Sequence, residues 1–287
     1  MTGAQLPLRP PDPQAPDRTD DAASSPALPV PAGWPEPPTV EAYHDVFGTI
    51  IEKLAPHTEA DPVAILTQLL VACGSAIGPG AYFQVEATRH HPAEFLLLAG
   101  DTAKARKGLS LDHVTRLMRD ADPDFQKRVS TGLTSGEGVV WALRDPQDGD
   151  PGTAEKRLLI IEPEFASVLK AASREISTLS PTLRSAWDAR PLQLLTKTAP
   201  VRATQAHISI IEHITAPKLR KYATNIEIAN DFLNRFMIVC YHRVRLLPES
   251  NNPNPFAHSG LPHYLTATIQ HTRSADQLTF NPHARTL

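Results

Sequence analysis

The chain has 287 residues, a formal net charge of −3 at pH 7 and a pI near 6.5. This length exceeds the roughly 100 to 200 residues of one ordinary domain, but a single α/β domain with extensions can absorb it. Because the net charge is slightly negative, the protein as a whole does not attract nucleic acid electrostatically, and any such contact would have to come from a local basic patch. The only cysteines, Cys73 and Cys240, lie in apolar segments, which favours reduced thiols over a disulfide framework. We therefore expect a cytoplasmic protein that does not contact a membrane.

The N-terminal part divides into a leader and a helical extension. Residues 1–38 hold eleven of the 28 prolines and few apolar residues, which predicts a disordered leader. Residues 39–90 form the predicted extension: apolar residues at helical spacing up to Leu54, and then a second, deeply packed helix with Asp61 as its N-cap. An alternating edge strand follows at Tyr82–Ala87.

The pair His90 and His91 comes next, and we interpret it as a turn between strands. A metal site is the alternative, although no third ligand stands at a suitable spacing nearby.

Residues 91–247 have the pattern of an α/β core. Short continuous apolar runs alternate with helical patterns, as expected for buried parallel strands covered on both faces: Phe95–Ala99, Leu158–Ile161, His207–Ile214 and Arg235–Tyr241. Residues 119–133 read as a polar connection, and a hairpin is expected around 192–204. Residues 248–287 are predicted to be a proline-rich loop and a partial C-terminal segment with one helix, Tyr264–His271, and we expect a truncated domain end.

The stretch Phe95–Ser110, FLLLAGDTAKARKGLS, has the order of a phosphate-binding loop: apolar strand, glycine, cationic loop, helix start. The strict GxxxxGK[ST] spacing is absent, because counting from Gly100 reaches Ala105 and Arg106 instead of glycine and lysine. A solvated basic turn is the alternative interpretation.

Two acids follow the second apolar run. Glu162 and Glu164 are two residues apart, so in an extended segment both project to one side. Carboxylates at the end of a parallel strand can hold the water shell of Mg²⁺ and polarise an attacking water. The alternative is a helix start enriched in acids, with Pro163 in its first turn.

Polar residues also flank the last two apolar runs. His213 and Thr215 are placed to sense a γ-phosphate, although a histidine at a strand end is often bonded only locally. Asn234 and Arg235 precede the last run, where Arg235 could act as an arginine finger toward a neighbouring subunit. A packing or surface arginine is the alternative.

This layout resembles a RecA/AAA-like P-loop NTPase core, with a mostly parallel sheet flanked by helices and an N-terminal helical extension. Over about residues 34–248 the amino-acid sequence is similar to that of the DUF3987-like proteins, which are predicted P-loop ATPases of actinobacteria. The segments that carry the resemblance include DPVAILTQLLVACGSAIG, SGEGVVWALRD, RLLIIEPEFASVLK, HISIIEHIT and NRFMIVCYHRVRLLPE. In two places, Ala105 and Asp231, we would expect glycine in relatives.

The resemblance implies a role for each matching residue. The nucleotide loop would comprise Gly100, Thr102, Lys104, Arg106, Lys107, Gly108 and Ser110, with Lys107 as the phosphate lysine. Glu162 and Glu164 would be the Walker B acids: Ser110 or Thr102 would hold Mg²⁺ together with Glu162, and Glu164 would orient the attacking water. The segment with Asn234 and Arg235 would supply an arginine finger or a sensor.

We therefore expect an ATPase that uses Mg²⁺ and ATP in DNA replication or mobile-element maintenance. It would be helicase-like or primase-associated, with DNA, further copies of itself or a primase or helicase as partners. One alternative is a nucleotide-binding or assembly module that has lost turnover. Another is a nucleic-acid-binding module that does not use ATP, with a patch formed by Lys218, Arg220, Lys221, Arg243 and Arg245.

Overall fold

A computed structural model describes residue 30 and residues 32–100, 107–195, 200–223, 231–247, 254–257 and 259–281. Its centre is a five-stranded sheet in the order β4-β5-β8-β3-β9, and every neighbouring pair in it is parallel. The strands are β3 (Phe95–Gly100), β4 (Val129–Ser130), β5 (Arg157–Glu162), β8 (His207–Thr215) and β9 (Phe236–Tyr241). The predicted α/β class with a mostly parallel sheet is thereby confirmed.

Strand β3 is the best-buried strand, with all six residues buried. It pairs over its whole length with β8 on one side and β9 on the other. A continuous apolar run suits this place, because helices cover both faces of a parallel sheet and leave no polar face to satisfy.

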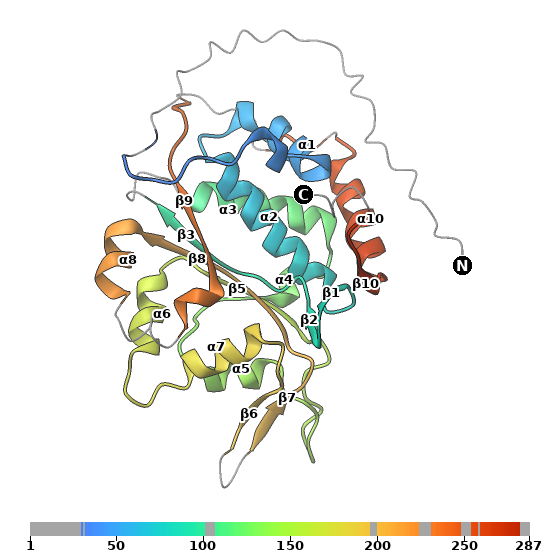
Figure 1. The fold of residues 1–287 in the computed structure, drawn as a ribbon. Helices are drawn as coiled ribbons and strands as arrows, with labels where there is room; N and C mark the ends of the chain where they lie inside the picture. The colour runs from blue at the N-terminus through green and yellow to red at the C-terminus, as the bar shows by residue number, and fades with distance from the viewer. Residues whose placement is uncertain are drawn as a thin grey trace.

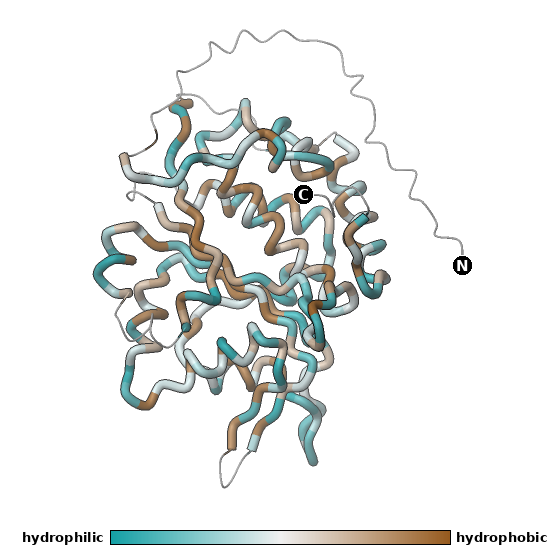
Figure 2. The backbone as a smooth tube through the Cα atoms, in the orientation of Figure 1, coloured by the Kyte–Doolittle hydropathy of each residue, from teal (hydrophilic) through white to brown (hydrophobic). Residues whose placement is uncertain are grey.

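Helices cover the sheet in two layers (Figure 1). Leu96 and Leu98 of β3 face the first layer, whereas Phe95, Leu97 and Ala99 face the second. The first layer contains α1 (Asp45–Leu54), α2 (Pro62–Ile77), α3 (Lys107–Ala121), α4 (Phe125–Arg128) and α10 (Leu261–Arg273). The second contains α5 (Gly136–Ala142), α6 (Phe165–Ala172), α7 (Leu179–Trp187) and α8 (Ala216–Tyr222). The backbone is most hydrophobic along the central strands and along α2, where the first layer packs on the sheet (Figure 2).

Helix α2 packs the first layer against the sheet. It is buried along most of its length, and the predicted N-cap is confirmed, since Asp61 Oδ1 accepts a hydrogen bond of 3.1 Å from the backbone N–H of Val63. The C-terminal helix α10 packs on this layer through Leu261, Leu265 and Ile269. The predicted extension and C-terminal helix are therefore parts of the same core as the sheet.

Smaller elements complete the described chain. The hairpin β6 (Leu192–Leu194) and β7 (Val201–Ala203) confirms the predicted pair. A separate three-stranded sheet joins β1 (Tyr82–Val85), β2 (Thr88–His90) and β10 (Gln277–Leu278). Short 3₁₀ turns lie at η1 (Val40–Ala42), η2 (Ala55–His57) and η4 (Leu233–Arg235).

Three sequence predictions need correction. The polar connection predicted at 119–133 contains the end of α3, then α4, and then β4, which is an edge strand of the main sheet. Strand β9 is the opposite edge strand and not a central one, and its Met237 and Ile238 are exposed. The strand predicted from Tyr82 belongs to the small sheet, where His90 ends β2 and does not lie in a turn.

Candidate functional site

The candidate site lies at the carboxyl edge of the sheet, where β3 and β8 end side by side at Gly100 and Thr215. After β3 the chain enters α3 in the first helical layer, and after β8 it enters α8 in the second (Figure 1). The chain thus leaves two adjacent strands toward opposite faces. In open α/β sheets, ligands bind at such switch points outside the carboxyl ends of the strands. We call this region the switch point.

Gly100 ends β3 where Tyr241 leaves little room for a side chain. A Cβ atom there would lie 2.9 Å from the ring and hydroxyl atoms of Tyr241, its cross-strand neighbour on β9. Tyr241 is 2 % exposed, and burial raises the pKa of its hydroxyl. Its ring also meets His213 edge-on, with 6.4 Å between centroids. Sequence reasoning missed Tyr241, because it reads as the last residue of an apolar strand.

The two predicted acids lie at the same edge. Glu162 ends β5, and its Oε1 accepts a hydrogen bond of 2.6 Å from the backbone N–H of Leu133. Glu164 directly precedes α6 and forms an ion pair with Lys218 of α8, with the lysine Nζ 3.1 and 3.0 Å from its two carboxylate oxygens. Glu162 therefore ends its strand on the side of the sheet where β3 also ends, in register with Leu97 and three residues before Gly100.

A third acid, Glu212, was not predicted to belong to the site. It stands on β8 directly beside Glu162 and is fully buried. Neither of its carboxylate oxygens has a hydrogen-bond partner within the described parts of the chain. Burial, and after it the nearby Glu162 carboxylate, raises the pKa of Glu212 well above its ordinary value of 4.5. The one sequence signal was an acid among the isoleucines of a strand expected to be buried, where unpaired acids are rare.

The predicted sensors His213 and Thr215 close β8 on the same edge. His213 faces the first helical layer and is 1 % exposed, while Thr215 pairs with Gly100. Ser110 lies in the first turn of α3, and its hydroxyl accepts a hydrogen bond of 2.9 Å from Nε2 of Gln68 on α2. In this conformation the Ser110 hydroxyl is held by the first helical layer.

The cationic loop between β3 and α3 falls outside the described residues, and with it the predicted ligands Thr102, Lys104 and Arg106. Lys107 is described only as the first residue of α3, and the exposed Gly108 follows it.

Arg235 is placed away from the other predicted site residues. It precedes β9 at the amino edge, whereas Gly100 lies at the carboxyl edge. The six residues of β3 are separated by five steps of roughly 3.3 Å, which puts the two edges on the order of 17 Å apart. A finger role for Arg235 therefore requires a neighbouring subunit and stays a prediction.

The neighbouring segment explains one departure from the expected pattern. Asp231 has a φ of 57°, a conformation that favours glycine, and Asn234 Nδ2 donates a hydrogen bond of 2.9 Å to its Oδ1. The glycine expected at this position fits the backbone that the structure shows.

Two of the cations predicted to bind nucleic acid are engaged in ion pairs. Lys218 contacts Glu164, and Arg243 Nε lies 3.4 Å from Glu59 Oε2. The predicted patch is therefore partly neutralised.

Within the described residues, no group of three or more histidine, cysteine, aspartate or glutamate side chains could hold a metal ion by itself. Mg²⁺ in nucleotide sites needs fewer protein ligands, because one or two carboxylates act together with the phosphates of the substrate. Glu162, at the end of β5, is an oxygen donor of this kind.

Comparison with known proteins adds no assignment. No protein-family model and no curated protein matches the chain. None of the helices in the described segments combines the length and the apolar character needed to cross a bilayer.

Proposed function

We propose that the protein binds Mg²⁺ and ATP at the switch point, as a RecA/AAA-like P-loop ATPase of the DUF3987-like kind. The observation that carries the proposal is the position of the acids. Glu162, Glu164 and the glycine-ended strand β3 all meet the edge from which the cationic loop leaves. Because β3, β8 and β5 run parallel, the loop after β3 and the acids at the end of β5 lie on the same side of the sheet, where one ligand could contact both.

Each residue then has a chemical task. Lys107 and the backbone N–H groups at the start of α3 would bind the phosphates, because the positive end of a helix favours anions. Glu162 would contribute a carboxylate oxygen to Mg²⁺, which neutralises charge on the phosphates when bound. Ser110 would join that shell only after its hydroxyl turns away from Gln68.

Hydrolysis makes a further demand on Glu164. To orient and polarise the attacking water it must give up its ion pair with Lys218, because a carboxylate bound to an ammonium group is a weaker acceptor. The freed Lys218 would then be available to the γ-phosphate. The work driven by this cycle is proposed to be on DNA, in a helicase-like or primase-associated role.

The test combines nucleotide binding with phosphate release. We expect a fluorescent ATP analogue to bind in the presence of Mg²⁺, and Lys107→Ala to weaken that binding by about tenfold or more, because a charge-assisted contact is lost. Lys127→Ala is the matched control, since that lysine is exposed and forms an ion pair with Asp124 three residues before it. Absence of binding at millimolar ATP would end the proposal.

A second candidate function is supported by the same ion pair. If Glu164 keeps Lys218, the protein binds nucleotide without turning it over and serves as an assembly module. Nucleotide-dependent oligomerisation without phosphate release, in wild type and in Glu164→Gln alike, would favour this function. Loss of phosphate release only in Glu164→Gln would favour the enzyme.

A further inference from the structure

The amino edge of the sheet carries a second candidate site, about 17 Å from the switch point at the rise per residue of a strand. A pocket of about 1010 Å³ opens there between the β1–β2 hairpin and the segments that flank β6 and β7. We call it the amino-edge pocket. Its polar lining includes Arg89, His90, Asp188, Arg190, Gln205 and Arg235. Its volume is of the size that small-molecule sites have.

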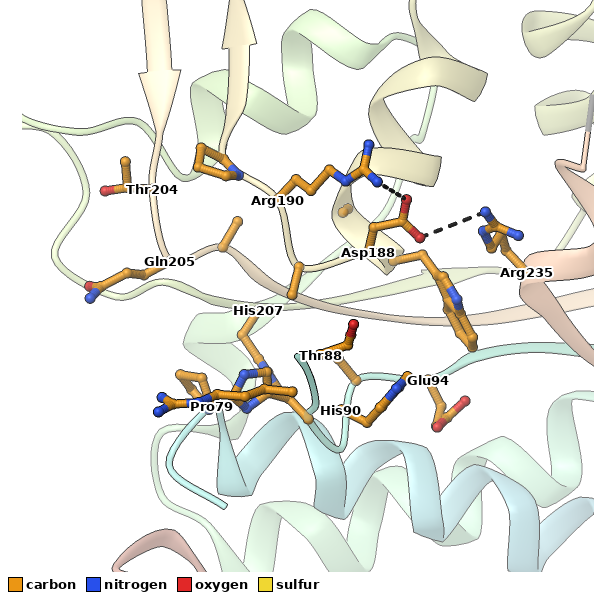
Figure 3. Close-up of a pocket in the computed structure, with 18 residues that line it drawn as sticks. Pro79, Thr88, His90, Glu94, Asp188, Arg190, Thr204, Gln205, His207 and Arg235 are labelled. Carbon is orange, nitrogen blue, oxygen red and sulfur yellow. Dashed lines mark ion pairs between the residues drawn. The ribbon is translucent and has the colours of Figure 1, made fainter. Parts of the chain in front are cut away.

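Cationic side chains from three separate segments meet in this pocket. Arg190 and Arg235 approach Asp188 from two sides, and His90 lies on the opposite wall with Glu94 (Figure 3). The lining therefore contains three arginines against two carboxylates. One of those carboxylates, Asp188, is already shared by two of the arginines.

The Asp188 contacts leave the arginines incompletely paired. Each guanidinium lies 3.6 Å from an Asp188 oxygen, which is longer than an ordinary charge-assisted hydrogen bond. Nε of Arg235 is buried and has no hydrogen-bond partner in the described segments. A buried donor without a partner is unfavourable, so an incoming acceptor would relieve it.

The backbone around the pocket is also unusual. Ala189 and Gln205 both line it, and both have positive φ, 52° and 58°, although neither is glycine. Such conformations are costly and persist where the surrounding structure enforces them, often at ligand clamps. Ala189 stands between Asp188 and Arg190, so its conformation sets the directions in which these two side chains leave the chain.

The histidine at the back of the pocket supplies no positive charge. His207 Nε2 lies 3.1 Å from the carbonyl oxygen of Gly74 and must donate to it, and burial lowers the pKa of His207 to about 4. It is therefore neutral at pH 7. Anion binding in the pocket depends on the arginines, with His90 as an additional donor.

We propose that the amino-edge pocket binds a phosphate monoester. A ligand that takes Arg190 and Arg235 must compete with Asp188, which offers a single negative charge. A phosphate monoester carries nearly two charges and three acceptor oxygens, so it outcompetes one carboxylate and matches the forked donors of arginine. The source of the phosphate is a free nucleotide or the 5′ end of a nucleic-acid strand, which have this group in common.

Binding is measured by anisotropy of a labelled, 5′-phosphorylated oligothymidylate, with its 5′-hydroxyl form, AMP and citrate as competitors. We expect Arg190→Gln and Arg235→Gln each to weaken phosphate binding by about tenfold. Arg174→Gln, which removes an exposed cation just after α6, is the matched control and should change nothing. A phosphorylated strand that binds better than AMP identifies a strand end as the ligand, and the reverse order identifies a free nucleotide.

Asp188→Asn gives an effect of opposite sign. It removes the internal competitor while keeping the shape of the side chain, so phosphate binding should become several-fold tighter. Damage to the fold would not produce such a gain, so this variant tests the proposal even where Arg235→Gln fails to fold.

Three results would overturn the proposal: citrate binding as tightly as the phosphates, phosphate binding that is indifferent to Arg190→Gln, or unchanged affinity in Asp188→Asn. The assay contains no ATP. It therefore measures the phosphate affinity of this pocket independently of phosphate release at the switch point.

Discussion

Replacing Glu212 by leucine should stabilise the protein. The side chain is fully buried on β8, and neither carboxylate oxygen has a hydrogen-bond partner among the described residues. Leucine has a similar size and brings no polar atom, so Glu212→Leu removes an unsatisfied group without opening a large cavity.

The magnitude depends on pH. Removing the unsatisfied carboxyl should add about 1–3 kcal/mol to the free energy of unfolding. Because the folded pKa of Glu212 is raised, the native state holds a proton that the unfolded state has lost, and ionisation then opposes folding. The native state is therefore least destabilised by Glu212 below the unfolded pKa, near 4.5. Its free energy of unfolding falls as the pH rises from there through the folded pKa. Each unit between the two pKa values is worth about 1.4 kcal/mol, so the advantage of leucine should grow as the pH rises above 4.5.

Urea denaturation between pH 5 and 8, in EDTA and without nucleotide, measures this difference. Glu175→Gln is the control, because Glu175 is exposed and should give no pH-dependent difference from wild type. A Glu212→Leu protein that is less stable than wild type at both ends of the range would refute the reasoning. It would mean that the Glu212 carboxyl has partners that stabilise it.

Three further predictions concern α2 and can be checked by thermal or chemical denaturation and by thiol labelling. Gly74→Ala should lower the unfolding free energy by about 1–3 kcal/mol, since the new Cβ would lie 2.2 Å from the backbone oxygen of Pro92; an unchanged melting temperature would contradict it. Asp61→Ala should lower the unfolding free energy by about 1–2 kcal/mol, because the N-cap and the hydrogen bond from the backbone N–H of His242 are both lost. A change near zero would show that water replaces both hydrogen bonds. Cys73 should resist iodoacetamide at pH 8 until urea unfolds the chain, because burial raises the pKa of its thiol to about 12; rapid labelling of native protein would be the contrary result.

The sequence predicted the central strands well, for a physical reason. Strands covered on both faces need mostly apolar residues: β3 and β5 have continuous apolar runs, and β8 has the apolar residues Ile208, Ile210, Ile211 and Ile214. The same reasoning misplaced β9, because its apolar run does not reveal that one side lacks a neighbouring strand. It missed β4, because two residues are too few to show a pattern.

The candidate sites show the same limit. Residues at strand ends, such as Glu162, could be assigned to one edge because parallel strands all end there. Glu212 could not, because its importance lies in a missing partner rather than in a motif. The amino-edge pocket was equally hidden, since segments around residues 90, 190, 205 and 235 meet only in the folded chain.

The strand order also has a consequence for synthesis on the ribosome. Phe95 of β3 pairs with Ile210 and Phe236, so both partners of this fully apolar strand emerge at least 115 residues later. At about 5–20 residues per second, β3 waits on the order of 6 to 23 seconds for its first neighbour. Helices α1 and α2 emerge before it and can shelter Leu96 and Leu98 in the meantime. The nascent chain should therefore be most vulnerable to aggregation, or most in need of a chaperone, while the residues between α3 and β8 are being made.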